Sequence, residues 1–236
     1  MRDLTYRATE RELMDDPAIS PLDLKEALFD ISKTNRMLGG NTITLKALKS
    51  LFKEYPSKKK WTIVDVGCGD GEMLRLIATY FASDPITLEL IGVDLSVQSI
   101  EMGRKMSQDY ENITFVEKDI VTIENESFNC DIIICTLTLH HFSDQEILVF
   151  MKQFVKLAQV AIVINDLQRS KIAYHLFRLF SRIFIKSHVA KNDGLVSIAS
   201  GFKKHELKKV AQQLKLKHSK ITWKWAFRYL WLIKTV

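Results

Sequence analysis

The 236-residue sequence lacks the features of several protein classes. Its strongest apolar run, Ile132 to Leu139, is far shorter than the roughly 20 residues that a membrane helix needs. Its first residues, MRDLTYRATERELMDD, contain no apolar segment typical of a secretory signal. Only three cysteines are present, and their spacing fits neither a disulfide framework nor a zinc motif. We therefore expect a reduced, cytoplasmic protein.

Acidic residues are nearly missing from the C-terminal part of the chain. Residues 1–168 hold 18 Lys and Arg against 26 Asp and Glu, whereas residues 169–236 hold 16 against only Asp193 and Glu206. Such a basic region could face nucleic acid, an anionic membrane or an acidic substrate, or it could be a solvated lysine-rich surface. The composition leaves these alternatives open.

The overall composition, 47% apolar and 26% charged, is that of a globular protein. Residues 1–60 predict a helical N-terminal cap. One helix begins at Ser20-Pro21, a favoured cap followed by proline at the first helical position, and ends at Gly39-Gly40. A second helix is expected over residues 44–53.

Short apolar runs then alternate with helical patterns. Strands are expected at residues 61–66, 88–93, 113–116, 131–135 and 160–164, and helices at 72–81, 97–107, 144–157 and 204–214. Near-continuous apolar strands alternating with helices are typical of a parallel sheet covered on both faces. Two final strands, 219–225 and 227–234, predict a hairpin. We expect an α/β, Rossmann-like, doubly wound, seven-stranded and mostly parallel sheet with an antiparallel last strand, in a domain spanning residues 61–236.

The densest chemical signal, Val64-Asp65-Val66-Gly67-Cys68-Gly69-Asp70-Gly71, lies where the first expected strand gives way to a helix. Ligands of open α/β sheets bind at the carboxyl ends of strands, where glycines let the backbone turn sharply and approach them. A dinucleotide fingerprint has the spacing G-x-G-x-x-G, but Glu72 occupies the sixth position here and would face a pyrophosphate. The spacing therefore favours a cofactor without phosphate.

This run resembles motif I of the class I S-adenosylmethionine (SAM)-dependent methyltransferases, in which the glycine loop wraps the methionine part of the cofactor. The resemblance implies SAM as cofactor and S-adenosylhomocysteine (SAH) as product. It also implies cofactor contacts from Asp65, Gly67, Cys68, Gly69 and Gly71.

Acidic residues follow the next two expected strands. Asp94 lies 23 residues after Gly71, the usual distance to an acid that binds ribose hydroxyls, and with Leu95 it matches the family's second motif. Asp119 and Ile120 follow the third strand, where the resemblance implies contacts with adenine. Thr136, at the end of the fourth strand, completes the expected cofactor set. The alternatives are a helix cap at Asp94 and an ordinary loop carboxylate at Asp119.

Two adjacent histidines follow the fourth strand. The run Leu-His140-His141-Phe resembles the small-molecule branch of the family, which includes quinone-biosynthesis methyltransferases. A histidine here could take a proton from a phenol or carboxylic acid as the methyl group arrives. Alternatively, the pair only caps a helix or holds a loop. Asp166, after the fifth strand, either lines the acceptor pocket and orients a histidine or pairs with Arg169.

A helical insertion over about residues 168–202 follows the fifth strand. Residues 171–186 predict an amphipathic helix with one basic stripe and an opposite apolar face. The stripe is Lys171, His175, Arg178 and Arg182, and the face is Ile172, Leu176, Leu179, Phe180, Ile183 and Phe184. The helix could be a lid over the acceptor pocket, an interfacial helix on an anionic membrane, or a packed helix covering the core.

These patterns predict an enzyme that transfers the SAM methyl group to a small apolar or aromatic acceptor, by O-methylation of a phenol or carboxylic acid. We expect no metal ion. The runs Asn35 to Gly40 and Asn165 to Arg169 resemble a bacterial group of stand-alone methyltransferases associated with polyketide-type pathways. Two alternatives stay open: an RNA- or protein-modifying methyltransferase that docks through the basic region, and a non-catalytic SAM-binding regulator.

Overall fold

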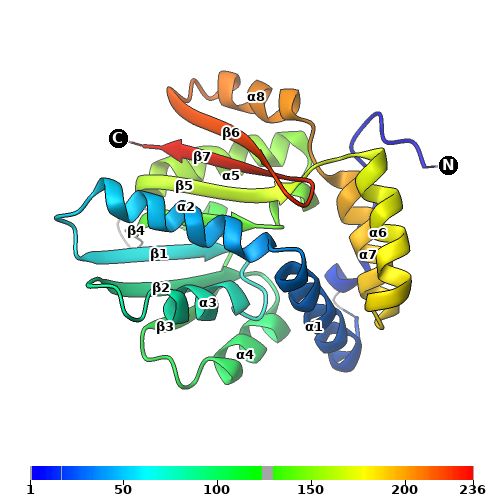
Figure 1. The fold of residues 1–236 in the computed structure, drawn as a ribbon, viewed down its shortest axis with the longest axis horizontal. Helices are drawn as coiled ribbons and strands as arrows, with labels where there is room; N and C mark the ends of the chain where they lie inside the picture. The colour runs from blue at the N-terminus through cyan, green and yellow to red at the C-terminus, as the bar shows by residue number, and fades with distance from the viewer. Residues whose placement is uncertain (1, 17, 124–129, 236) are drawn as a thin grey trace.

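A seven-stranded sheet forms the middle layer of the structure, a computed structural model that describes residues 2–16, 18–123 and 130–235 (Figure 1). The strands are β1 (Lys60–Val66), β2 (Thr87–Asp94), β3 (Ile113–Glu117), β4 (Cys130–Thr136), β5 (Ala158–Leu167), β6 (His218–Lys224) and β7 (Arg228–Lys234). Their order across the sheet is β3-β2-β1-β4-β5-β7-β6, and only β7 runs antiparallel to its neighbours. The predicted fold class is therefore confirmed, and the strand order reverses between β1 and β4.

Helices cover both faces of the sheet and one of its ends. They are α1 (Pro21–Met37), α2 (Gly40–Glu54), α3 (Glu72–Tyr80), α4 (Val97–Met106), α5 (Asp144–Leu157), α6 (Lys171–Phe184), α7 (His188–Ser200) and α8 (Lys204–Gln213). Short 3-10 turns are η1 (Leu13–Asp15), η2 (Ile120–Thr122) and η4 (Leu139–His141). Local signals explain their starts: the Ser20 hydroxyl accepts the Asp23 N–H at 3.1 Å before α1, and Ser143 forms a capping box with Glu146 before α5. None of the helices in the described ranges has the length and hydropathy that crossing a bilayer requires.

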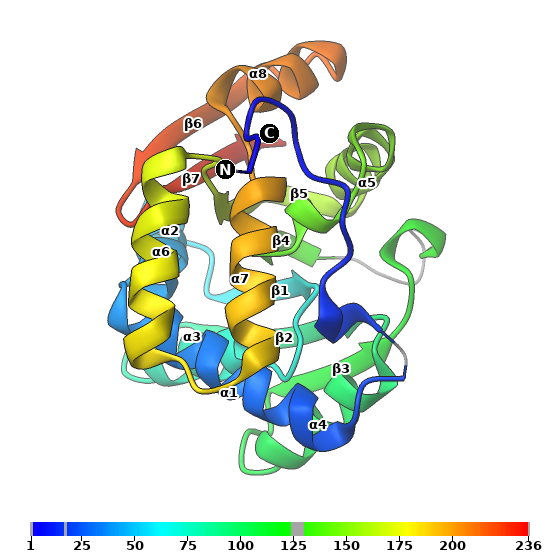
Figure 2. The same ribbon diagram turned by 90° about the vertical axis from the view of Figure 1, so that its right-hand side faces the viewer.

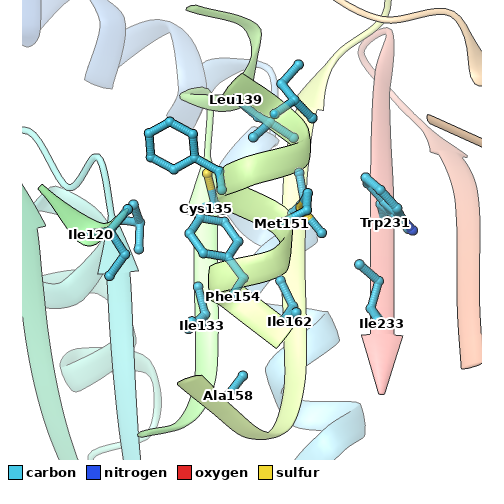
Figure 3. Packing of buried hydrophobic residues seen from close by; sticks show 14 of the residues in the cluster. Ile120, Ile133, Cys135, Leu139, Met151, Phe154, Ala158, Ile162, Trp231 and Ile233 are labelled. Carbon is cyan, nitrogen blue, oxygen red and sulfur yellow. The ribbon is translucent and has the colours of Figure 1, made fainter. Parts of the chain in front are cut away.

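The sheet is buried on both faces, which is why its strands have continuous apolar runs. On one face Met151 and Phe154 of α5 pack on Ile133, Ile162 and Trp231 (Figure 3). The other face is covered by side chains from α2, α3 and α4, which include Leu48, Leu74, Ile77 and Ile100. Helix α2, expected as part of an N-terminal cap, thus packs on the sheet beside α3.

A second group of elements gathers where the parallel strands end. Helices α1, α6 and α7 and the N-terminal segment, residues 2–16, lie together at this end of the sheet (Figures 1 and 2). Helix α7 is central to this group because it contacts α1, α6, η1 and η4. The predicted helical insertion is present here as α6 and α7.

The structure decides which side of α6 is buried, a question that the sequence pattern left open. Five of the six residues of the expected apolar face are exposed, with Ile172 at 64%, Leu179 at 59% and Ile183 at 69%. The packed side lies between the two expected stripes and includes Phe177, whose ring Cζ would be only 2.2 Å from a Cβ atom at Gly194 of α7. Glycine at position 194 therefore lets the Phe177 ring pack closely against α7, and this contact fixes which side of α6 is buried.

Candidate functional site

A loop with three glycines connects β1 to α3. Gly67, Gly69 and Gly71 have positive φ angles of 71°, 53° and 76°, a left-handed conformation that is costly for other residues. A Cβ atom at Gly67 would lie 2.2 Å from Cγ2 of Thr138, which belongs to the turn after β4. The Gly67 N–H also donates to the Val93 carbonyl at 2.8 Å. The loop is therefore packed tightly against the ends of β2 and β4.

The carboxylate of Asp94, at the end of β2, holds this loop in place. Its Oδ2 accepts the N–H of Gly69 at 2.8 Å, and its Oδ1 accepts the N–H of Ser96 at 2.9 Å. Burial raises the pKa of Asp94, although these hydrogen bonds oppose the shift. Each carboxylate oxygen keeps a further lone pair, so Asp94 can also accept hydrogen bonds from ligand hydroxyls in the adjoining cavity.

Asp65 lies in β1 just before the loop and is 2% exposed. Its Oδ1 has no hydrogen-bond partner among the residues that the structure describes. Burial, together with the nearby Asp94 charge, raises the pKa of Asp65 well above its usual value. An unpaired buried acceptor carries a desolvation penalty, which a ligand N–H donor at the cavity wall would remove.

The other predicted cofactor residues lie at neighbouring strand ends. Asp119 accepts a backbone N–H of η2 at 2.9 Å, and Ile120 is buried beside it. The Thr136 hydroxyl at the end of β4 is 3.3 Å from the Thr44 hydroxyl of α2. Leu95, after β2, is 64% exposed. These positions surround the carboxyl edge of the sheet, as expected for an open α/β fold.

These residues share one cavity of about 1570 Å³. This exceeds the roughly 300–1,000 Å³ of a typical small-molecule pocket, so a cofactor and an acceptor fit together. The predicted site residues that line it are Asp65, Gly67, Cys68, Gly69, Asp94, Leu95, Asp119, Ile120, Thr136, His140 and His141. Gly71 and Asp166 do not line it. The lining also includes aromatic side chains, which are Tyr6, Phe142, Phe150, Phe177, Phe180, Trp225 and Phe227.

His140 is 3% exposed, and carboxylates face both of its ring nitrogens. Its Nδ1 lies 2.7 Å from Asp166 Oδ1, and its Nε2 lies 3.3 Å from Glu12 Oε1. Burial alone lowers the pKa of His140, but Asp166 and Glu12 outweigh burial and raise it to about 10. The ring is thus a cation at neutral pH and has no lone pair to accept a proton. Asp166 therefore pairs with His140, and Arg169 binds Glu206 instead.

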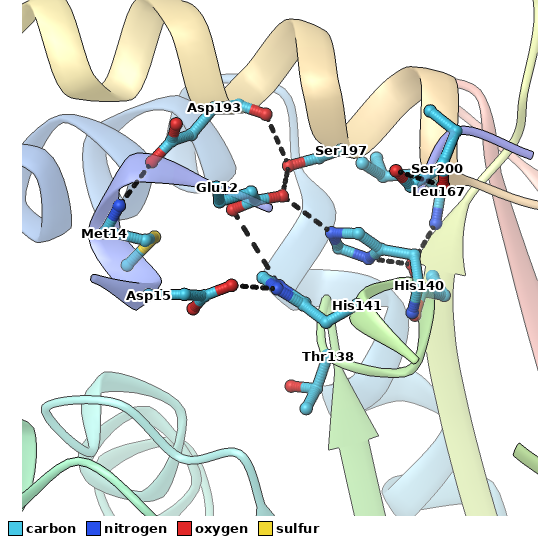
Figure 4. A network of polar contacts seen from close by, with 12 residues as sticks. Glu12, Met14, Asp15, Thr138, His140, His141, Leu167, Asp193, Ser197 and Ser200 are labelled. Atoms are coloured by element: carbon cyan, nitrogen blue, oxygen red, sulfur yellow. Dashed lines mark hydrogen bonds and ion pairs between the residues drawn. The ribbon is translucent and has the colours of Figure 1, made fainter. Parts of the chain in front are cut away.

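His141 lies beside His140, with ring centroids 4.4 Å apart, and reaches the cavity (Figure 4). Its Nδ1 is 2.9 Å from Asp15 Oδ2, and its Nε2 is 3.8 Å from Glu12 Oε2. When neutral His141 donates from Nδ1 to Asp15, its Nε2 keeps a lone pair. This geometry is that of a histidine base oriented by a carboxylate.

Glu12 and Asp15 belong to the N-terminal segment, which crosses the strand ends (Figure 2). Asp193 of α7 accepts two successive backbone N–H groups of η1 at 2.8 and 2.9 Å. The Ser197 hydroxyl, one turn later on α7, donates to Glu12 (Figure 4). These hydrogen bonds fix the segment to α7 and thereby place the carboxylates of Glu12 and Asp15 beside the two histidines.

Sequence reasoning did not identify Glu12, Asp15, Asp193 or Ser197. Glu12 and Ser197 are 185 positions apart, so no local spacing joins them. One signal was available: Asp193 is one of only two acids in the basic C-terminal region, and the structure places it at 1% exposure. A lone acid in such a region indicates a specific partner, since a buried carboxylate needs hydrogen bonds.

Glu12, His140 and His141 also have potential metal-ligand atoms within 4.8 Å of one another, in the part of the chain that the structure describes. Two histidines and one carboxylate can bind zinc or iron. In this structure, however, Nε2 of His140 faces the Glu12 carboxylate at 3.3 Å, so a metal ion bound between them would have to displace this contact. The same side chains can therefore either exchange a proton or bind a metal ion. Treatment with a chelator distinguishes these two functions.

Residues 63–159 match the sequence profile of the family described as "Methyltransferase domain". The matched range contains the glycine loop, Asp94, Asp119 and both histidines. Among curated proteins, an uncharacterized methyltransferase of Bacillus subtilis (strain 168), YcgJ, is 28% identical over 96 residues. The alignment covers 40% of this chain and 36% of that relative, so the matched part spans about a third of the relative's length.

Solved methyltransferase structures share the fold over most of the chain. The plantazolicin methyltransferase BpumL, in complex with SAH, has a TM-score of 0.65 at 19% identity, covering 90% of this chain and 96% of that one. Magnesium protoporphyrin IX methyltransferase (ChlM) from Synechocystis PCC 6803, with bound SAH, has a TM-score of 0.54 at 15% identity, covering 83% and 82%. At these identities the likeness establishes the fold alone.

Proposed function

We propose that this chain, a class I SAM-dependent methyltransferase by its matched domain and its fold, transfers the SAM methyl group to a small apolar or aromatic acceptor, at the oxygen of a phenol or carboxylic acid. One observation carries the proposal. A single cavity is lined by the glycine loop and buried acids, by an oriented histidine and by aromatic side chains.

The residues around the glycine loop fit SAM, which when bound supplies a methyl group on a positively charged sulfonium. The unpaired Oδ1 of Asp65 would accept a hydrogen bond from the amino group of the cofactor. Asp94 would accept the ribose hydroxyls and Asp119 the adenine amino group, while Leu95 and Ile120 give apolar contacts. The surrounding carboxylates also favour a cationic ligand electrostatically. The remaining predicted residues, Gly67, Cys68, Gly69, Gly71 and Thr136, shape the loop and the strand end.

His141 would take the acceptor's proton. In a transfer that replaces the acceptor's O–H bond by an O–methyl bond and releases SAH, Nε2 of His141 would receive the proton from the acceptor oxygen. Asp15 and Glu12 would stabilise the resulting imidazolium by charge. His140 is then a positioning residue, since with Asp166 it holds the Glu12 carboxylate in place.

The aromatic lining supports an apolar or aromatic acceptor. Phe177 and Phe180 of α6 and Phe227 after β6 line the same cavity as His141. Apolar and aromatic walls with a few placed polar groups are typical of small-molecule sites. In this proposal α6 forms the side of the acceptor pocket, as a lid would.

Two measurements test the proposal together. Calorimetry should detect binding of SAM and SAH. Methyl-labelled SAM, incubated with a panel of apolar phenols and carboxylic acids, should then yield a labelled ether or ester, and mild alkaline hydrolysis releases label only from the ester. Absence of SAH binding, or label found only in carbon- or nitrogen-methylated products, contradicts the proposal.

The alternative, an RNA- or protein-modifying enzyme that docks through the basic region, has less support. Among the described basic residues of 169–236, only Arg228 lines the cavity. Helix α8 and strand β6, which contain several of the lysines, lie at one edge of the sheet instead (Figure 1). RNA binding that falls steeply with salt and competes with methyl transfer would favour the alternative.

A further inference from the structure

The outward side of α6 carries a ridge of exposed aliphatic residues, which we call the α6 ridge. It consists of Ile172, Leu176, Leu179 and Ile183, with exposed fractions of 64%, 49%, 59% and 69%, and Leu176 also lines the cavity. Their spacing of four, three and four residues places them along one stripe of the helix. Single exposed apolar residues are normal, but a continuous stripe of this kind marks a contact surface.

Basic side chains flank the α6 ridge. Lys171, Arg178 and Arg182 are exposed on the same helix, and Lys186 follows its end. Arg178 and Arg182 form no ion pair with any residue in the described ranges, and α6 contains no acidic residue. An apolar stripe beside unpaired cations suits a surface that is both apolar and negatively charged.

A row of aromatic rings leads from the end of α6 to the cavity. Phe184 is 41% exposed and stacks on Phe180 with ring centroids 4.7 Å apart. Phe180 lies beside Phe177 at 6.4 Å, and both of these rings line the cavity. The exposed side of α6 is thus connected to the cavity by side chains that an apolar molecule could follow.

We propose that the α6 ridge and its flanking cations dock on an anionic lipid surface, so that an apolar acceptor enters the cavity from the membrane. Lipid acyl chains would cover the ridge, and lipid phosphates would pair with Arg178 and Arg182. A second copy of the chain fits less well, because a two-fold contact would bring like charges together. Nucleic acid would leave the aliphatic ridge in water.

Vesicle co-sedimentation of the whole protein tests the proposal and needs neither SAM nor acceptor. A negative result would contradict membrane docking without contradicting the proposed function. Vesicles of phosphatidylcholine alone are compared with vesicles that also contain phosphatidylglycerol. We expect binding to the anionic vesicles that weakens as salt is added, and little binding to the neutral ones. Equal binding to both, or to neither, overturns the proposal.

Two double variants divide the surface into its parts. Arg178→Gln with Arg182→Gln should weaken binding to anionic vesicles about 30-fold, from about 1 kcal/mol per cation. Leu179→Gln with Ile183→Gln should weaken it at least about tenfold, because buried apolar area is lost. All four side chains are exposed and lie outside the cavity lining, so folding and SAH binding should persist.

Matched controls carry the same changes elsewhere. Val149→Gln with Val155→Gln alters two exposed apolar residues of α5, and Lys208→Gln with Lys209→Gln removes two exposed cations of α8. Both controls should bind vesicles as the parent protein does. Equal losses in controls and α6 variants overturn the proposal. So does sedimentation analysis in which the parent self-associates through the α6 ridge without binding vesicles.

Discussion

The two walls of the cavity are built in different ways. The cofactor wall comes from the ends of β1 to β4 and the loops that follow them, within residues 63–138, and the Gly69 N–H, for example, donates to Asp94, 25 positions away. The acceptor wall combines the N-terminal segment, η4, α6 and α7. There Glu12 pairs with His140 across 128 positions and with Ser197 across 185.

The two walls therefore depend on different features of the chain, one on backbone geometry and the other on contacts between distant side chains. In the cofactor wall, backbone geometry leaves little freedom, since even a Cβ atom collides at Gly67. In the acceptor wall, side chains from distant segments meet, and their positions depend on how α7 holds the N-terminal segment. Under the proposed function, the wall formed by distant segments would set the acceptor, as expected where loops carry specificity on a rigid scaffold.

The largest expected effect separates chemistry from cofactor binding. His141→Ala should lower kcat by roughly 10²–10⁴, because the acceptor's proton loses its base. The affinity for SAH, measured by calorimetry, should stay unchanged, since no cofactor contact is altered. His205→Ala, an exposed histidine of α8 outside the cavity lining, is the matched control and should leave both quantities unchanged. Normal turnover by His141→Ala would assign the rate to proximity alone.

The next effect tests the cofactor wall. Gly67→Ala should weaken SAH binding about 100-fold, because its Cβ would displace Thr138 at the loop in addition to straining the backbone. Gly39→Ala is a close control: its φ is 72° against 71° at Gly67, but no atom lies within 4 Å of its new Cβ. Gly39→Ala should lower Tm by only a few degrees, with SAH affinity unchanged. Equal losses of affinity in both variants would attribute the effect to backbone strain instead of close approach.

Sequence patterns placed the predicted cofactor residues at neighbouring strand ends for a physical reason. Its motifs combine strand, glycine turn and helix within a few residues, so spacing alone indicates the geometry. The predicted fold, with β7 opposed to the other strands, is confirmed, and residues 63–159 match the family described as "Methyltransferase domain". The roles of Asp65, Asp94 and Asp119 stay predictions, although all three side chains reach one cavity.

The acceptor wall shows where such reasoning ends. The sequence identified the histidine pair but could not distinguish its members, because the distinction comes from Glu12 and Asp15 on a distant segment. The sequence left the orientation of α6 open for the same reason. Its packed side is chosen by Gly194 on a neighbouring helix, and helical periodicity alone contains no information about that neighbour.

A smaller effect concerns stability and pH. The pKa of His140 is raised from 6.5 to about 10, so its charge stabilises the fold fully below about pH 6.5 and progressively less as pH rises toward 10. The parent protein should therefore lose about 1.5–3 kcal/mol of its stability advantage over His140→Gln between pH 7 and 10. Urea unfolding at several pH values measures this difference, in which other titrating groups cancel.

The partner of His140 behaves in the opposite sense. Burial raises the pKa of Asp166, but the His140 charge outweighs burial and lowers it, so the contribution of Asp166 is lost only as pH falls below its usual value of 3.8. Asp166→Asn should therefore remove the alkaline pH dependence that depends on a charged His140. A parent-to-His140→Gln difference that stays constant from pH 7 to 10 would show that His140 is neutral in the folded protein.

The last prediction is that removal of metal ions has no effect. It tests whether the residues of the acceptor wall bind a proton or a metal ion. Treatment with EDTA should leave kcat and SAH affinity unchanged, because Glu12 already accepts hydrogen bonds from His140 and Ser197 where a metal ion would bind. A metal ion at Glu12, His140 and His141 would instead take the Nε2 lone pair that the proposed base needs. Loss of turnover that zinc or iron restores, with one equivalent of metal bound and retained SAH affinity, would therefore replace base catalysis by metal activation of the acceptor. It would leave the cofactor wall as described, because no predicted cofactor residue belongs to that cluster.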